Sequence, residues 1–443
     1  MKPLLSKKTS YFKGASKVPG DKSISHRSLM FGALAVGETI ISGLLEGEDV
    51  LATAQAMRQM GAEITRGSDG LWRVHGVGLG GLKQPEETLD MGNSGTSTRL
   101  LMGVVGGHNI EARFDGDASL TKRPMKRVMD PLSEMGVEFE ASEGGRLPLT
   151  VKGSAQPLAL EYRLPVASAQ VKSAIMLAGL NARGTTCVIE EKPTRDHTEK
   201  MLKAFGVDVD VETLDDGAQA IKVKGGQDLQ PCAIDVPGDP SSAAFPAVAA
   251  TLIDGAEVRL AGICVNDRRD GVYRALQALG ADVRYEHQRI EGGEDVADIV
   301  VKGGAPLKGC TLDPVIVPSM IDEFPVFAMA AACAEGTTYM SGLEELRVKE
   351  SDRLLMVAEG LKACGVNLEM GEDSLTIHGT GQPPKGGARV ETALDHRIAM
   401  AFLVLGCVSD EPIEIDDGAP IQTSFPNFVK LMNELGAEIE DIK

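Results

Sequence analysis

The chain has 443 residues, of which 43% are hydrophobic, 25% charged and 4% aromatic, and its formal net charge is −19 at pH 7. These values predict a globular protein of two or three domains whose core relies on Ala, Val, Leu, Ile and Met, because aromatic residues are few. The negative charge disfavours nucleic acid and anionic membranes as partners, and it makes any local cluster of Lys and Arg informative.

The cysteines and the apolar segments indicate the cellular compartment. The seven Cys are dispersed, so the sequence contains no CxxC pair or zinc knuckle, and we expect reduced thiols. No apolar run approaches the roughly 20 residues of a membrane helix, and the N-terminal segment MKPLLSKKTSYFKG lacks the hydrophobic core of a signal peptide. We therefore expect a cytoplasmic protein.

Along the chain, a pattern recurs in which an amphipathic stretch ends at a Gly that is followed by the start of a β-strand. The Gly of the six copies lie 70 to 85 residues apart, at Gly61, Gly136, Gly206, Gly280, Gly365 and Gly436. Each Gly fits the left-handed conformation that commonly ends a helix. Self-similarity over such a period is typical of a repeat architecture.

A strand that ends in Gly follows five of the six copies, with the sequences LWRVHG, LPLTVKG, AIKVKG, DIVVKG and SLTIHG. The sixth copy lies close to Lys443 and is followed by no such strand. The N-terminal segment TSYFKG, which ends at Gly14, has residues suited to the vacant place. We predict that this segment completes the sixth repeat and that the two termini meet there.

The tetrapeptide VPGD occurs at Val18–Asp21 and again at Val236–Asp239, on either side of three complete repeats. If the N-terminal strand belongs to the last repeat, the chain must cross between domains near both copies. This predicts one domain of residues 1–20 plus 241–443 and a second of residues 21–240, with hinges near 18–23 and 236–242. A continuous solenoid of six repeats is the alternative, and the closing N-terminal strand argues against it.

Each repeat also contains a helix that is rich in small residues and almost wholly apolar. In chain order these read SHRSLMFGALAVG, GTSTRLLMGVVG, SAQVKSAIMLAGL, SSAAFPAVAATL, IDEFPVFAMAAACAEG and HRIAMAFLVLG. A helix that is apolar on all sides is buried. The pattern predicts an α/β fold with helices inside and sheets outside.

Four segments concentrate positive charge, with the sequences GDKSISHR, TKRPMKR, RVKESDR and LDHR. Any one of them alone can be solvated surface charge. Lys22 and Arg397, however, lie at or near the start of a buried helix. Free N–H groups and the positive end of the helix dipole favour anions at such starts, so we expect small anionic ligands there.

Hydroxyl groups also lie at helix starts, at Ser23, Thr96 and Ser168, although each can be a plain N-cap. The Gly-rich segment Gly92–Arg99 permits a close approach of the backbone to a ligand, but it fits neither a P-loop nor a dinucleotide fingerprint.

Two carboxylates occur among the cations. Asp322 precedes a buried helix, and Glu350 lies between Lys349 and Arg353. Such groups can serve as a base or, when desolvated, as an acid. For Asp322 an N-cap is an equally good interpretation.

Taken together, VPGDKSISHR, GNSGTSTRLLMG, GDASLTKRPM, VASAQVKSA, SMIDEFP, RVKESDR and LDHRIAM closely resemble the 5-enolpyruvylshikimate-3-phosphate synthase family, over nearly the full chain and in the family's order. The segments GDASLTKRPM, PTRDHTEKML and GLEELRVKESDRL are similar to its class II bacterial branch, in which glyphosate-tolerant enzymes occur. The resemblance implies a two-domain inside-out α/β barrel, with three βαβαββ repeats in each domain.

The resemblance also implies a reaction. The enolpyruvyl group of phosphoenolpyruvate moves to the 5-hydroxyl of shikimate 3-phosphate and phosphate leaves, which is the sixth step of the shikimate pathway to chorismate. No metal or organic cofactor is implied, and the expected state is a monomer.

The family's residue roles carry over to matching positions. Shikimate 3-phosphate is assigned to Lys22, Ser23, Arg27, Thr96, Ser168, Gln170, Arg195, Asp322 and Lys349. Phosphoenolpyruvate is assigned to Lys22, Gly95, Arg123, Gln170, Arg353 and Arg397, and arginine forks suit both carboxylate and phosphate. Asp322 is expected to accept the hydroxyl proton, and Glu350 with Lys22 to protonate the methylene carbon as a tetrahedral intermediate forms. Domain closure is expected to assemble the site and expel water.

Two positions depart from the commoner family pattern. Thr423, in QTSFPNF, stands where many members carry a Lys, and Glu345 stands where an Asn is frequent. Both changes fit the class II branch. Gly95 has no side chain, so we expect room for the inhibitor glyphosate beside shikimate 3-phosphate.

Other functions remain as alternatives. UDP-N-acetylglucosamine enolpyruvyl transferase shares the fold, but the loop around GDASLTKRPM has no Cys and Lys22 is followed by Ser rather than Asn. RNA 3′-phosphate cyclase has related units but binds nucleic acid, which the net charge opposes. A non-catalytic binder of phosphorylated ligands is disfavoured by the intact Lys22, Asp322 and Glu350.

Overall fold

A computed structural model describes residues 1–442, which divide into two compact units. Unit 1 comprises Met1–Pro19, Pro237–Ile290 and Asp295–Lys443, and unit 2 comprises Gly20–Val236 and Glu291–Glu294.

The described strands of unit 2 form three sheets with one common order, in which the first two strands are parallel and the later neighbours are antiparallel. The sheets are β14 (Ala233–Asp235), β3 (Val36–Ser42), β5 (Trp72–Val77) and β4 (Glu63–Arg66); β6 (Leu89–Asp90), β7 (Glu111–Asp115), β9 (Arg146–Lys152) and β8 (Glu138–Ser142); and β10 (Glu161–Arg163), β11 (Thr185–Glu190), β13 (Gln219–Lys224) and β12 (Val209–Thr213).

Unit 1 repeats this order. Its sheets are β2 (Lys13–Ser16), β15 (Glu257–Cys264), β17 (Glu294–Lys302) and β16 (Asp282–Glu291); β18 (Glu335–Ser341), β20 (Ser374–Thr380) and β19 (Asn367–Met370); and β21 (Arg389–Val390), β22 (Ile413–Ile415), β1 (Leu4–Lys7) and β23 (Glu438–Asp441). In the second of these sheets, isolated parallel bridges from Lys308 and Thr311 to β18 occupy the place of the first strand.

The N-terminal strand that completes the sixth repeat is not the one predicted. β1 lies between β22 and β23 and is antiparallel to both, whereas Lys13–Ser16, which overlaps the end of TSYFKG, pairs in parallel with β15 of the fourth repeat. The prediction for TSYFKG was wrong because it relied on the terminal Gly. Leu4 and Ser6 of β1 are buried in alternation with half-buried neighbours, as a central strand requires, while β2 is largely exposed.

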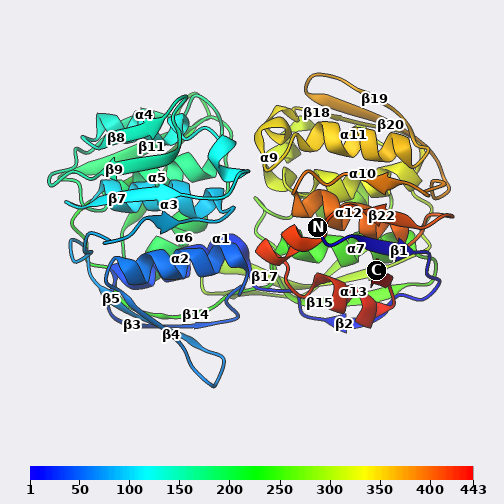
Figure 1. The fold of residues 1–443 in the computed structure, drawn as a ribbon, viewed down its shortest axis with the longest axis horizontal. Coiled ribbons are helices and arrows are strands. Elements are labelled where there is room, and N and C mark those ends of the chain that lie inside the picture. Colours follow the sequence, from blue (N-terminus) through cyan, green and yellow to red (C-terminus); the bar gives the residue numbers. More distant parts are fainter. Residues whose placement is uncertain (443) are drawn as a thin grey trace. The chain divides into compact units, whose positions relative to one another are not determined.

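The apolar helices lie inside. They are α1 (Lys22–Leu34), α3 (Gly95–Gly106) and α5 (Ala169–Gly179) in unit 2, and α7 (Pro240–Leu252), α10 (Phe324–Cys333) and α12 (His396–Gly406) in unit 1 (Figure 1). The outer, amphipathic helices are α2 (Glu48–Gln59), α4 (Lys126–Glu134), α6 (His197–Ala204), α8 (Gly271–Ala278), α11 (Arg353–Ala363) and α13 (Phe428–Leu435). The Gly that follows each outer helix has a positive φ, between 78° and 119°, which confirms the predicted caps.

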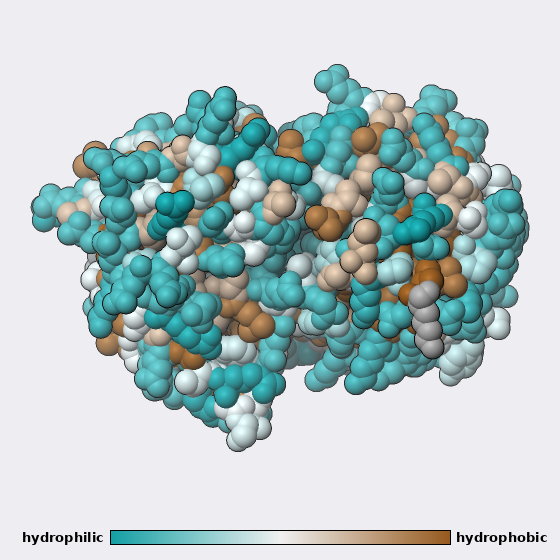
Figure 2. Space-filling view, in the orientation of Figure 1, coloured by the Kyte–Doolittle hydropathy of each residue, from teal (hydrophilic) through white to brown (hydrophobic). Residues whose placement is uncertain are grey.

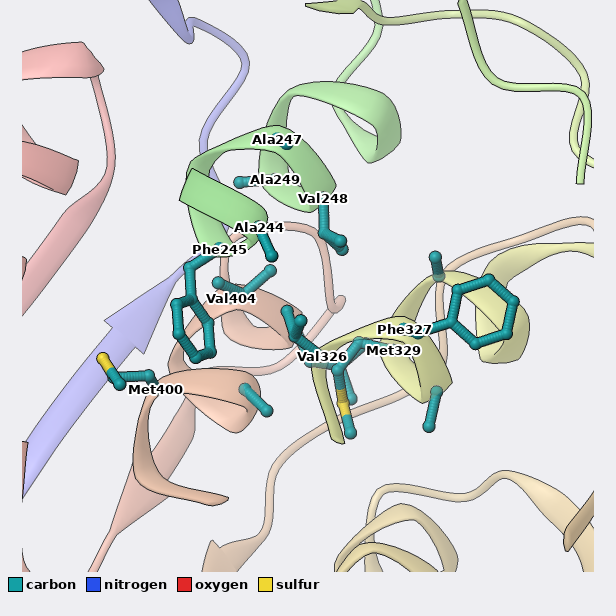
Figure 3. Close-up of a cluster of buried hydrophobic side chains, with 14 of the residues drawn as sticks. Ala244, Phe245, Ala247, Val248, Ala249, Val326, Phe327, Met329, Met400 and Val404 are labelled. Carbon is teal, nitrogen blue, oxygen red and sulfur yellow. The ribbon is translucent and has the colours of Figure 1, made fainter. Parts of the chain in front are cut away.

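Small residues allow the buried helices to approach closely. Figure 3 shows Ala244 and Val248 of α7 facing side chains from α10 and α12, including Val326 and Val404. In unit 2 a Cβ added at Gly103 of α3 would collide with the backbone of α5. Close packing of this kind fixes the helix ends relative to one another.

Hydrophilic residues predominate on the face drawn in Figure 2, and hydrophobic side chains occur there singly or in small groups. Among residues 1–442, no helix combines the length and the apolar character needed to span a bilayer.

Candidate active site

The start of α1 carries the first predicted ligands. Asp21 caps this helix by accepting a hydrogen bond from the Ile24 backbone N–H at 2.9 Å, so the N-cap alternative for Ser23 is wrong. Lys22 forms an ion pair through Nζ with Oδ2 of Asp49, at the start of α2. No sequence signal marked Asp49, because its role depends on how α2 packs against α1.

Arg27, one turn into α1, is 4% exposed. Its guanidinium donates to Thr198 Oγ1 at 2.8 Å, to Ser173 Oγ at 2.7 Å and to the Ser23 carbonyl at 3.0 Å. Burial lowers the pKa of Arg27 to about 10, with the Glu199 and Asp21 carboxylates opposing the shift and the Arg195 charge adding to it. Arg27 is therefore still a cation at neutral pH, and Arg195 lies near enough to influence it.

The starts of α3 and α5 are joined by side chains. Gln170 donates through Nε2 to Thr96 Oγ1 at 3.0 Å and accepts at Oε1 from Arg99 at 2.7 Å. Ser94 caps α3, so Thr96 is not its N-cap, while Ser168 caps α5 as the alternative interpretation allowed. Arg99 was not among the predicted site residues, although it ends the quoted segment GNSGTSTR.

Arg123 is 7% exposed and lies beside the start of α3. It donates to the Asn93 side chain at 2.6 Å and to Ser119 Oγ at 3.1 Å. A Cβ added at Gly95 would lie 3.1 Å from a guanidinium nitrogen of Arg123 and 3.1 Å from one of Arg99. Gly95 thus keeps the space between two arginines open.

A buried histidine ties the starts of α1, α2 and α3 together. His26 Nδ1 lies 2.8 Å from Thr53 Oγ1, which lies 2.7 Å from Ser97 Oγ. Burial, assisted by the positive charges of Lys22 and Arg27, holds the pKa of His26 well below its ordinary value.

This shift gives a prediction for stability against pH. In the folded chain His26 stays neutral, whereas in the unfolded chain it binds a proton below about pH 6.5, so stability falls as the pH drops through that value, by at most about 1.4 kcal/mol per pH unit. We expect His26→Asn to reduce the slope of unfolding free energy against pH between about pH 5 and 6.5, as measured by urea denaturation. His75→Asn, at an exposed site, is the control. Equal slopes for His26→Asn and the unsubstituted protein would contradict the prediction.

In unit 1 the predicted acids and cations form one cluster around Arg353. This side chain is 1% exposed and contacts Asp322 Oδ1 at 3.0 Å, Asp395 Oδ2 at 2.8 Å and Glu350 Oε2. Lys349 Nζ lies 3.3 Å from Asp322 Oδ1. Burial opposes the charge of Arg353, but the carboxylates of Asp395, Glu350 and Asp322 together raise its pKa.

Arg397 joins the start of α12 to that of α10. Its Nη1 donates to the Asp322 carbonyl at 3.0 Å and lies 3.4 Å from Glu323 Oε1, and Glu323 in turn accepts from Ser241 at the start of α7. Asp395 caps α12, whereas Asp322 makes no cap, because Glu323 holds the N-cap position of α10 without a side-chain bond. The N-cap alternative for Asp322 is therefore wrong.

In each unit, the starts of the three buried helices are connected by side chains, and cations gather there. In unit 2 these cations include Lys22, Arg27, Arg99 and Arg123, and in unit 1 they include Arg269, Lys349, Arg353 and Arg397. Thr423 is half-buried, and its hydroxyl lies 3.4 Å from His396 Nδ1 at the start of α12. Within residues 1–442, no group of His, Cys, Asp and Glu is arranged to hold a metal ion.

Such an arrangement suits anionic substrates. Positive helix ends and arginine forks bind phosphate and carboxylate. Carboxylates in contact with those cations can exchange protons with a bound substrate.

Comparison with solved structures defines the class of fold. The enolpyruvyl transferase NikO from Streptomyces tendae is 17% identical, with a TM-score of 0.78, and the match covers 100% of this chain and 99% of that one. At this identity the likeness shows the fold alone, which is that of the enolpyruvyl transferases, as predicted.

Closer relatives identify the family. The family model of EPSP synthase (3-phosphoshikimate 1-carboxyvinyltransferase) matches residues 6–432. Proteins named 3-phosphoshikimate 1-carboxyvinyltransferase from Paramagnetospirillum magneticum and Parvibaculum lavamentivorans are 57% and 58% identical, over 99% and 96% of this chain and 98% and 94% of theirs. EPSP synthase from Acinetobacter baumannii is 46% identical, with a TM-score of 0.88 over 100% of both chains.

The chain belongs to the EPSP synthase family, which confirms the predicted resemblance. It is a transferase whose small-molecule substrates are phosphoenolpyruvate and shikimate 3-phosphate, and it moves the enolpyruvyl group from the first to the second. These relationships favour this reaction over transfer to UDP-N-acetylglucosamine.

Proposed function

We propose that the helix starts of unit 2 bind shikimate 3-phosphate through Lys22, Ser23, Arg27, Thr96, Ser168, Gln170 and Arg195, together with Asp322 and Lys349 of unit 1. The observation that carries this proposal is the joining of α1, α3 and α5 at their N-terminal ends by Arg27 and Gln170. Exposed N–H groups and buried cations at such a junction match a phosphate ester.

Phosphoenolpyruvate is held by Arg123, Arg353 and Arg397, with Lys22, Gly95 and Gln170 beside it. Arg123 and Arg353 are both buried, and their side chains are held by several hydrogen bonds. A guanidinium fixed in this way can meet a carboxylate or a phosphate in two-point contacts with little loss of rotamer entropy.

The proton transfers use Asp322 and Glu350. Asp322 removes the proton of the 5-hydroxyl as the oxygen bonds to C2 of phosphoenolpyruvate, while Glu350, with Lys22, delivers a proton to C3. In the elimination the same groups act in reverse: Glu350, with Lys22, takes a proton back from C3, the C2–O bond to phosphate breaks, and the leaving phosphate accepts the proton held by Asp322. The product is the new vinyl ether. Contact of both acids with one buried arginine supports their joint action.

Two substitutions test which residues bind which substrate. Arg195→Ala should raise the KM for shikimate 3-phosphate more than that for phosphoenolpyruvate, and Arg123→Ala should do the reverse. A phosphate-release assay, with each substrate omitted in turn as a blank, provides both constants. Equal effects on the two constants would show that the residues are assigned to the wrong substrates.

The enzyme acts as a monomer in the cytoplasm, and glyphosate occupies the phosphoenolpyruvate pocket beside shikimate 3-phosphate. The space between Arg99 and Arg123 at Gly95 supports this placement of the inhibitor.

We expect Gly95→Ala to raise the inhibition constant of glyphosate roughly 10- to 100-fold, which corresponds to the cost of about 1–3 kcal/mol for overpacking a tight site. The KM for phosphoenolpyruvate should change less, because we expect the new methyl group to clash sterically with glyphosate more than with phosphoenolpyruvate. Gly92→Ala serves as a control within the same segment, since a Cβ there meets nothing within 4 Å, although its φ of 52° adds strain. A similar rise in both constants for Gly95→Ala would refute the steric explanation.

A further inference from the structure

Unit 2 contains a buried lysine that the proposed reaction does not use. Lys172 lies on α5 and its side chain is 0% exposed. Its Nζ is 3.0 Å from Glu190 Oε1 and 2.7 Å from Glu199 Oε1, and these side chains are 1% and 6% exposed. A buried ammonium is costly unless it is paired, and the pairing must have good geometry to offset desolvation. The ion triad therefore holds its members in defined positions.

The two carboxylates bracket one loop. Glu190 is the last residue of β11, and Glu199 lies in the first turn of α6. Thr194, within the loop, donates to the second oxygen of Glu190 at 2.6 Å. The ammonium of Lys172 thus fastens both ends of the loop to α5, and the loop carries Arg195.

The ion triad of Lys172, Glu190 and Glu199 is also connected to Arg27. Thr198, adjacent to Glu199, accepts from Arg27 Nε at 2.8 Å, and its hydroxyl lies 2.7 Å from that of Ser173, the neighbour of Lys172. The Arg27 guanidinium also donates to Ser173. Lys172 does not reach the surface itself. It fixes the hydroxyls of Thr198 and Ser173, which orient Arg27, and it fixes the loop that contains Arg195. Arg27 and Arg195 are the two proposed ligands of the phosphate.

We infer that Lys172 is a positioning residue for the 3-phosphate of shikimate 3-phosphate, acting through Arg195 and Arg27. This inference rests on the proposed assignment of those two arginines to the phosphate. A triad that merely stabilised the fold would change the amount of folded enzyme and affect both substrates alike. A positioning triad changes the recognition of one substrate.

The test uses the full chain and the phosphate-release assay. Lys172→Met removes the ammonium but keeps an unbranched side chain, and we expect at least a tenfold rise in the KM for shikimate 3-phosphate with less than a twofold change in the KM for phosphoenolpyruvate. The matched control is Lys152→Met, which breaks the exposed Lys152–Glu140 pair in the same unit and should leave both constants unchanged. If Lys172→Met does not fold, Lys172→Met/Glu190→Gln/Glu199→Gln removes the carboxylates left unpaired, and the same selective rise is expected.

A double-substitution cycle with Arg195→Ala identifies the route of the effect. Because Lys172 acts partly through Arg195, the combined rise in the KM for shikimate 3-phosphate should be smaller than the product of the single rises. A folded variant with an unchanged KM for shikimate 3-phosphate, or with both KM values raised alike, overturns the inference while leaving the effect of Arg195→Ala intact. If Arg195→Ala itself leaves that KM unchanged, both the assignment of Arg195 and the inference fail.

Discussion

Asp322→Asn is expected to lower kcat by roughly 10²- to 10⁴-fold, the range typical for loss of a general base. Asn has nearly the same shape and can still accept the hydrogen bond that Arg353 donates to Asp322 Oδ1 at 3.0 Å. It cannot accept a proton from the 5-hydroxyl of shikimate 3-phosphate. The loss should therefore appear in kcat, with smaller changes in the KM of either substrate.

The control for this substitution is Asp313→Asn. Asp313 is exposed and caps a short 3₁₀ helix, Pro314–Ile316, and Asn is also a good capping residue. Steady-state kinetics should show kcat within about twofold of the unsubstituted enzyme for this control. A comparable kcat for Asp322→Asn would exclude Asp322 as the base and move that role to another carboxylate of the Arg353 cluster.

Arg353→Met is expected to lower the unfolding free energy of unit 1 by about 3–5 kcal/mol, the usual cost of removing one partner from a buried ion pair. The arginine is 1% exposed and Asp395, which faces it, is 0% exposed. Removing the guanidinium leaves Asp395 without its closest cation and takes away one proposed fork for phosphoenolpyruvate. Urea denaturation should show the lower unfolding free energy, and steady-state kinetics should show a higher KM for phosphoenolpyruvate.

A double substitution distinguishes the effect of the unpaired Asp395 charge on stability from the effect of the cavity left by Arg353. Arg353→Met/Asp395→Asn removes the carboxylate charge and keeps a residue that can cap α12, as Asp395 does by accepting from the Arg397 N–H at 2.9 Å. We expect the double variant to regain part of the lost stability but none of the affinity for phosphoenolpyruvate. No recovery of stability would mean that the cavity, rather than the unpaired charge, causes the loss.

The repeat architecture was readable from the sequence because it depends on local rules. A Gly such as Gly436 marks a left-handed cap where it follows an amphipathic helix, and an almost wholly apolar helix such as that beginning at His396 is buried. The closing strand was misassigned because Leu4–Lys7 and Lys13–Ser16 are both short and their sheet partners lie more than 200 residues away along the chain.

The site, too, was predictable from the sequence in part, and the rest depended on tertiary structure. The sequence by itself determined the family, and through it which lysines, arginines and acids to name, since these stand in contiguous segments such as RVKESDR. Tertiary structure alone decided that Asp395 neutralises Arg353, that Asp49 holds Lys22 and that Lys172 fastens the loop of Arg195. Partners of a buried charge are chosen by distance in the packed protein, and no pattern of spacing along the chain records that distance.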